Sequence, residues 1–441
     1  MVNTDKLFLL GLIGLLVLTG CAPKPTFSKV DGCRNQWLEI ANDDYPQGEN
    51  PRDIQYYERL LAQDPRDFSS WHNKGLRLLI ENRPREAQGC FLRALAVNPR
   101  FAEAMSAQAL ACWRLGKRHK ALELLDQAVK INPGLDTAWF NRGILLLKLN
   151  RLPEALACSR QILKYAPRSP RAWALQGRCL QLQGQYAQAL RAYQRAFKLD
   201  PRPYPQLLSY MGSDLLELGR NREALECLET SLRQDPKQPA AWVYSAVARE
   251  RLENYPQALE ACREALRYDP QYAEAWAAKA RLLNISGSGK EALASIDRAL
   301  ALKPKNAEFW GQKGMILFYG KDWSAALQAF DRAVALDPGS PAWVWGNRGA
   351  VLARRHRNDA ALASYDRALQ LRPQDEVFWT HKGLVLLELG QVEPALECFD
   401  RALRINSRLT LAWEGKAQAL DKLSRPLEAR RCRQKAGKLE Q

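Results

Sequence analysis

Residues 138–167 read AWFNRGILLLKLNRLPEALACSRQILKYAP, and this stretch decides the fold. Asn150, near its middle, is a residue type that tolerates the left-handed end of a helix. Pro167 closes the stretch, because the residue before a proline is kept out of the helical region. Gly143, four residues after Trp139, allows a second helix to approach closely. The stretch therefore predicts a helix, a tight turn and a second helix.

The same pattern returns along the chain at a nearly constant interval. Prolines are spaced by 34 residues, with two steps of 35, at positions 65, 99, 133, 167, 201, 236, 270, 304, 338 and 373. A tryptophan stands in the first half of most units, at 71, 139, 173, 242, 276, 310, 345, 379 and 413. We expect this tryptophan to fill the space between neighbouring units. Helix caps are expected after the proline, at Asp67, Asp136, Ser169, Asn306, Ser340 and Asp375.

This repeat resembles the tetratricopeptide repeat (TPR), as the quoted stretch and SYDRALQLRPQDEVFWTHKGLVLLELG (364–390) illustrate. The resemblance implies an all-α fold, a right-handed superhelical solenoid of about eleven helix-turn-helix units. First helices would line a concave channel, and second helices would cover the convex side. The solenoid is expected over 51–441, with a half-unit cap at 51–67 and whole units over 68–441. Two units are one residue longer, opening with RPYPQ (202–206) and GSPAWVWGNRG (339–349).

The amino-terminal residues read as an export signal. Residues 7–19 form an apolar run of 13 residues, which suits a signal peptide better than a membrane-spanning helix of about 20 residues. The following Leu-Thr-Gly-Cys, 18–21, resembles a bacterial lipobox. That resemblance implies a signal peptide over 1–20, a covalent lipid on Cys21 and a flexible tether over 21–50. An uncleaved anchor and an ordinary signal peptide remain the alternatives.

Location and charge together narrow the choice of partner. We expect an exported protein, lipid-anchored to the cell membrane or outer membrane of a bacterium. The net charge of +17 favours anionic partners such as headgroups, acidic polymers, nucleic acid or acidic proteins. Because export argues against a cytoplasmic RNA-binding protein, no nucleic acid is expected.

The sequence offers no catalytic or metal-binding pattern. The segment ISGSGKEA (285–292) lacks the glycine and the hydroxyl residue of a phosphate-binding loop, having Asn284 and Glu291 at those positions. Four histidines occur without a His-Glu-x-x-His or Cys-x-x-Cys motif. We therefore predict a non-enzyme without metal or cofactor, apart from the lipid on Cys21.

Nine cysteines follow Cys21, and we expect most of them to be small buried hydrophobic residues. Five share one position in the second helices: Cys90, Cys158, Cys227, Cys398 and Cys432. The pairs Cys90–Cys112 and Cys158–Cys179 are the ones that the fold could bring closer together. Cys33, in the tether, is expected to be exposed and reactive.

Peptide binding is the usual function of the family that the repeat resembles. The resemblance implies a channel-facing asparagine two residues after the tryptophan, a position filled here by Asn73, Asn141 and Asn347. Tyr210 and Tyr244 occupy that position in other units, and Arg178, Arg281 and Trp343 are further channel candidates. The lysine and asparagine set that clamps a terminal carboxylate is not supplied by any three successive units.

Three functions follow in order of preference. The first is a membrane-anchored scaffold or adaptor that binds protein segments or subunits of an envelope complex and supports assembly of a cell-envelope machine. The second is binding of an anionic envelope polymer or lipid by the basic surface. The third is an RNA-binding helical-repeat protein.

Overall fold

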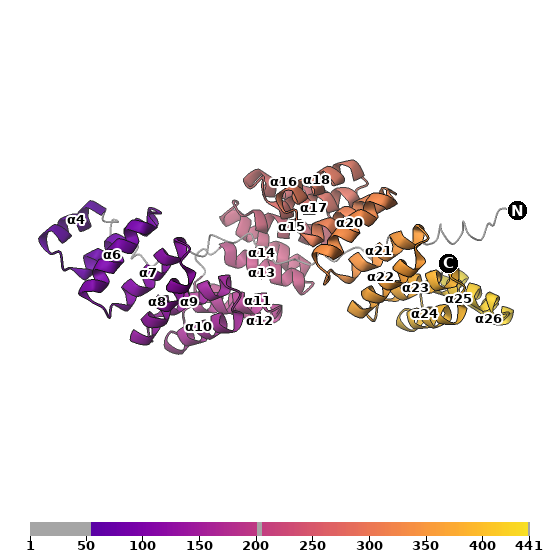
Figure 1. Cartoon of the computed structure of the whole chain (residues 1–441), viewed down its shortest axis with the longest axis horizontal. Helices are drawn as coiled ribbons and strands as arrows, with labels where there is room; N and C mark the ends of the chain where they lie inside the picture. The colour runs from indigo at the N-terminus through magenta and orange to yellow at the C-terminus, as the bar shows by residue number, and fades with distance from the viewer. Residues whose placement is uncertain (1–53, 201–204, 440–441) are drawn as a thin grey trace. The chain divides into compact units, whose positions relative to one another are not determined.

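The computed structural model describes residues 54–200 and 205–439, which form 23 α-helices and no strand (Figure 1). A single helix, α4 (Ile54–Gln63), precedes the repeats. The first helices of the repeats are α5 (Phe68–Ile80), α7 (Ala102–Arg114), α9 (Asp136–Lys148), α11 (Pro170–Leu182), α13 (Pro205–Glu217), α15 (Pro239–Arg251), α17 (Ala273–Ile285), α19 (Ala307–Tyr319), α21 (Ala342–Arg354), α23 (Glu376–Glu388) and α25 (Thr410–Lys422).

The second helices alternate with these along the chain. They are α6 (Pro84–Val97), α8 (Arg118–Ile131), α10 (Leu152–Tyr165), α12 (Tyr186–Leu199), α14 (Asn221–Gln234), α16 (Tyr255–Tyr268), α18 (Gly289–Leu302), α20 (Trp323–Leu336), α22 (Asn358–Leu371), α24 (Val392–Ile405) and α26 (Pro426–Leu439). The all-α repeat predicted from the sequence is confirmed.

The helices fall into two compact units that divide between Glu253 and Asn254. Inside each unit, a second helix packs against its own first helix and against the first helix of the next repeat. Successive first helices also contact one another, as in the series α5, α7, α9, α11 and the series α17, α19, α21, α23, α25. The first helices therefore form a continuous layer within each of these series. None of the helices in the described residues is both long enough and apolar enough to cross a bilayer.

Left-handed residues make the turns inside the repeats, as predicted. Asn150 has the positive φ that the sequence predicted, and so do six asparagine or glycine residues at the equivalent place in other repeats: Asn82, Gly116, Gly184, Gly219, Gly287 and Gly390. Four further residues, which sequence reasoning did not single out, adopt the same conformation: Glu253, Lys321, His356 and Ser424. A residue other than glycine adopts this conformation at a modest steric cost, so the surrounding helix pair imposes the turn even without glycine.

Glycine in the first helix makes room for a ring from the second helix. A Cβ added at Gly314 would lie 2.7 Å from Phe330, and one at Gly177 would lie 2.6 Å from Tyr193. The same 16-residue spacing joins Gly75 to Phe91 and Gly383 to Phe399. These rings are buried and form the core between paired helices.

Four of the six expected helix caps are confirmed. The side chains of Asp67, Ser169, Asn306 and Asp375 accept hydrogen bonds from backbone N–H groups of the first turn. The other two predictions were wrong. Asp136 is the first residue of α9, and Leu135 occupies the cap position. Ser340 precedes Pro341, and its hydroxyl donates back to the carbonyl oxygen of Asp337 across 2.6 Å.

Candidate protein-binding surface

In eight of the eleven repeats, the tryptophan links the first helix to the segment that ends the preceding helix. Its indole Nε1 donates to the carbonyl oxygen of the residue six positions earlier, at 2.9–3.2 Å, in Trp71, Trp139, Trp173, Trp242, Trp276, Trp310, Trp379 and Trp413. The acceptor is the repeat proline in seven of these cases, and for Trp413 it is Ser407. The tryptophan thus joins neighbouring repeats by a hydrogen bond and also fills the space between them, as the sequence predicted.

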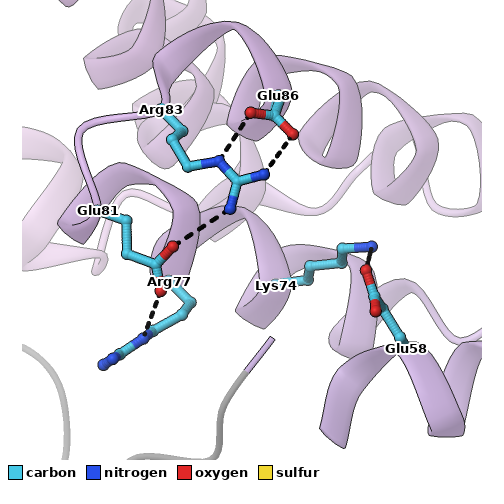
Figure 2. A network of polar contacts seen from close by, with 6 residues as sticks. All are labelled: Glu58, Lys74, Arg77, Glu81, Arg83 and Glu86. Atoms are coloured by element: carbon cyan, nitrogen blue, oxygen red, sulfur yellow. Dashed lines mark hydrogen bonds and ion pairs between the residues drawn. The ribbon is translucent and has the colours of Figure 1, made fainter. Parts of the chain in front are cut away.

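Ion pairs join neighbouring repeats beside the tryptophans. A cation three residues after the tryptophan meets a carboxylate of the preceding second helix in Arg142–Asp126, Lys313–Asp297, Arg348–Asp331, Lys382–Asp366 and Lys416–Asp400. Figure 2 shows the first member of this series, Lys74 with Glu58 of α4, at 2.9 Å. These pairs link each first helix to the helix that precedes it.

The predicted asparagines differ in their surroundings. Asn141 is buried and donates through Nδ2 to the hydroxyl of Ser106 on α7, across 3.1 Å. Asn347 is buried and donates to the carbonyl oxygen of Trp343, one turn earlier in α21, across 2.8 Å. Asn73 is half-buried. Asn141 and Asn347 therefore hold first helices together or brace their own helix in this conformation, and peptide binding by the three remains a prediction.

The other predicted positions also lie partly inside the fold. Trp343 is 3% exposed and packs against Gly311 of α19, and its indole nitrogen has no hydrogen-bond partner among the described residues. Tyr244 is half-buried against Leu228 and Leu232 of α14. Arg281 of α17 is half-buried.

Arg178 and Tyr210, two of the predicted channel residues, are brought together between α11 and α13. The Arg178 guanidinium lies 4.6 Å from the centre of the Tyr210 ring, a cation–π distance. Its Nη1 donates to Oε1 of Gln181 across 2.5 Å. The Tyr210 ring stacks on that of Tyr193, with ring centres 6.0 Å apart.

Gln181 is the centre of this network. Its Nε2 lies 2.6 Å from Oδ1 of Asp214 and 2.9 Å from the hydroxyl of Ser213, both on α13. The sequence analysis did not identify Gln181 or Asp214 as site residues. The available signal was an aspartate inside the apolar run MGSDLLELG (211–219), which a packed first helix does not ordinarily contain.

Two carboxyl groups in the network are poorly compensated. Asp214 is fully buried, and among the described residues its Oδ2 has no hydrogen-bond partner. Glu217 is half-buried, and its Oε1 likewise lacks a partner among those residues. Burial raises the pKa of Asp214 to about 8, against the opposing effects of the Gln181 hydrogen bond and the Arg178 charge. Burial also raises the pKa of Glu217. The network can therefore hold a proton near neutral pH, and its half-buried members Arg178 and Gln181 offer polar contacts to a ligand.

Catalytic and metal chemistry find no support in the parts of the chain that the structure describes. No group of three or more histidine, cysteine, aspartate or glutamate side chains there could hold a metal ion. The eight cysteines of those parts are free thiols, and all except the half-buried Cys227 are buried, as predicted. Cys21 and Cys33 lie outside the described residues.

Comparison with known proteins identifies the repeat. A family model described as Tetratricopeptide repeat matches residues 72–136, 211–273, 246–307, 286–341 and 312–376. Three further models with that description match 113–179, 170–203 and 377–408. No curated protein matches the chain.

Many solved structures are similar in fold. A chain of the APC/C hetero-tetramer Cut9–Hcn1 is 13% identical with a TM-score of 0.51, over 92% of this chain and 94% of that chain. A tetratricopeptide repeat protein from Parabacteroides merdae is 18% identical with a TM-score of 0.47, over 57% and 98%. YrrB, described as a TPR protein with an unusual peptide-binding site, is 21% identical with a TM-score of 0.36, over 44% and 98%.

Proposed function

This chain belongs to the tetratricopeptide repeat family, and we propose that it is a membrane-anchored scaffold that binds protein partners and supports assembly of a cell-envelope machine. The family typically consists of non-catalytic protein-interaction scaffolds, so we infer binding without catalysis. The membrane and the envelope are the parts of the proposal that rest on the sequence of residues 7–21.

The continuous layer of first helices is the main observation that supports the proposal. Within each series the first helices contact one another, so an extended partner segment would meet side chains from several repeats at once. The network around Gln181 places a half-buried guanidinium and a half-buried amide together on α11, held from beneath by the buried Tyr210 ring of α13. Polar groups positioned in this way suit recognition of a protein segment.

Crosslinking in cells tests partner binding. A photo-crosslinking residue at Gln181, on first helix α11, should capture one or a few envelope proteins. The matched control is a crosslinking residue at Arg191, an exposed position of second helix α12. Capture of proteins from position 191 alone would contradict binding at the first helices.

Fractionation tests the anchor. The Cys21→Ser variant should leave the membrane fraction, because acyl chains contribute about 0.8 kcal/mol per buried CH₂ group and the variant cannot acquire the thioether-linked chains. Retention of the variant on membranes through a high-salt wash would contradict lipid anchoring.

The net charge of +17 supports a second candidate, binding of an anionic envelope polymer or lipid by the basic surface. Exposed charge pairs are screened within about 8 Å at physiological salt. Co-purification of glycan or lipid that disappears at high salt, without captured protein, would favour this candidate over the scaffold.

A further inference from the structure

The turn between α21 and α22 contains four consecutive basic residues, Arg354, Arg355, His356 and Arg357. Arg354 is half-buried and the other three are exposed. None of the three arginines forms an ion pair or a side-chain hydrogen bond with any described residue. Comparison with the equivalent positions of the other repeats shows why the partners are missing.

Arg357 lacks the glutamate that its equivalents bind. Arg83, Arg151, Arg220 and Arg425 stand at the same position, and each pairs with a glutamate three residues later. Figure 2 shows the pairing for Arg83, whose guanidinium contacts Glu86 at 2.7 Å and also Glu81 at 3.3 Å. The residue three positions after Arg357 is Ala360, so its guanidinium has no such partner.

Arg354 does not make the backbone contact that its equivalents make, and it lies in the repeat that contains an extra residue. Arg114, Arg251 and Lys422, at the same repeat position, each donate to a carbonyl oxygen 35 residues earlier, at the end of the preceding first helix. The inserted residue near Ser340 makes that interval 36 residues for Arg354, whose equivalent acceptor would be Phe318. Arg354 instead lies over the indole ring of Trp323, 4.9 Å from its centre.

The environment of Arg354 is short of negative charge. Burial alone lowers its pKa, without an opposing carboxylate, and its Nε has no partner. The nearby Glu388 accepts a hydrogen bond from Nδ2 of Asn358 across 3.3 Å. Asp359 is exposed at the start of α22. The turn therefore carries an excess of positive charge that is not neutralised by ion pairs with the described residues.

We propose that the Arg354–Arg357 turn, with the Trp323 ring as its platform, is a carboxylate-binding site for an acidic segment of a protein partner. Nε of Arg354 is buried, whereas a guanidinium over an indole ring can still donate from its two Nη atoms, and that pair matches the two oxygens of a carboxylate. Three unpaired guanidiniums in one turn suit a run of Asp and Glu residues better than a single carboxylate. The site rests on the proposed function, because it assumes that the occupant is a protein.

Binding of a labelled glutamate-rich peptide to the whole chain in detergent tests the site. The same peptide with glutamine at each glutamate is the ligand control. The triple variant R354A/R355A/R357A should bind the glutamate peptide about tenfold more weakly. The matched control R83A/R151A/R220A removes the same charge from paired arginines and should retain the affinity.

Two further variants distinguish a specific carboxylate-binding site from non-specific electrostatic attraction. Trp323→Leu changes no charge, yet it removes the platform and should weaken binding several-fold. The triple lysine variant R354K/R355K/R357K keeps the charge but loses the two-point contact, so it should also bind more weakly. Equal loss in both alanine triple variants, or full affinity in Trp323→Leu, would overturn the proposal.

Vesicles containing phosphatidylglycerol distinguish a lipid occupant. Loss of vesicle binding in R354A/R355A/R357A, with unchanged peptide binding, would assign the turn to headgroups and overturn the proposal. A photo-crosslinking residue at the exposed Ser324 should capture acidic segments in cells. If neither the peptide nor Ser324 gives a signal while position 181 still captures partners, the carboxylate site fails and the scaffold function stands.

Discussion

The indole nitrogen of Trp310 donates a hydrogen bond to the carbonyl oxygen of Pro304 across 2.9 Å. In repeat nine the extra residue places Trp345 seven positions after its proline, Pro338, and the indole nitrogen of Trp345 has no hydrogen-bond partner in the part of the chain that the structure describes. The indole–carbonyl hydrogen bond is therefore present where the tryptophan follows its proline by six residues, and it is absent from the repeat that is one residue longer.

Replacing these two tryptophans by phenylalanine should have unequal effects. Trp310→Phe removes a formed hydrogen bond and leaves the Pro304 carbonyl without its partner, whereas Trp345→Phe removes an N–H that has no partner. Both changes lose similar apolar area, so the difference in free energy of unfolding should be about 1 kcal/mol, with Trp310→Phe the more destabilising. Urea denaturation of both variants measures it, and equal losses would contradict the role of the hydrogen bond.

Adding a methyl group at Gly314 should destabilise the protein. The new Cβ would lie 2.7 Å from the Phe330 ring, so the ring or the helix must move, at a cost of about 1–3 kcal/mol. Gly89→Ala is the control, because a Cβ there meets nothing within 4 Å and α6 gains helix propensity worth up to about 1 kcal/mol. Thermal denaturation should therefore shift in opposite directions for the two variants.

Asp214 should make the protein less stable as the pH rises. Its pKa is about 8 in the fold and 3.8 ordinarily, so the unfolded chain releases the proton first between these values. The stabilising contribution is complete below pH 3.8 and is lost as the pH rises towards 8. Asp214→Asn mimics the protonated group and should be more stable than the parent at pH 8 by about 1 kcal/mol or more. A variant less stable than the parent at pH 8 would show that the carboxylate is needed in its charged form.

His381 should oppose this trend in acid. It is buried, stacks on Tyr365, and burial lowers its pKa to about 4, with a further contribution from Arg354. Stability is therefore lost as the pH falls from 6.5 towards 4, because the unfolded chain binds the proton first. His381→Phe keeps the ring stack and should reduce the acid sensitivity between these pH values. An unchanged pH profile by urea denaturation would mean that His381 is protonated without opening the fold.

Thiol labelling should separate the cysteines. Burial raises the pKa of Cys179 to about 12 and that of Cys398 to about 11, so neither forms a reactive thiolate at neutral pH. In the native protein we expect iodoacetamide to modify Cys33 and to spare Cys179 and Cys398, with peptide mapping as the readout. Rapid modification of Cys179 without denaturant would contradict its burial.

Sequence reasoning found the repeat because its signals are local. The prolines and turn residues such as Asn150 act within one helix pair, and each was read correctly from spacing. The cap predictions at Asp136 and Ser340 failed because helix starts shift by one residue with little change in the local pattern. The proposed peptide positions were harder still, since Asn141 and Asn347 find partners inside the fold.

The sequence by itself determined that this chain is a stack of helix pairs, because a 34-residue repeat of turn, glycine and proline signals permits little else. Only the tertiary structure decided which polar and charged side chains find partners within the fold. Residues 29, 32, 33 and 35 positions apart in the chain become neighbours there, joining Gln181 to Tyr210, Ser213 and Asp214 and linking Arg251 to Leu216. Contacts of that range are set by how successive repeats pack, and in repeat nine Arg354 lies over the Trp323 ring and lacks the backbone contact that its equivalents make.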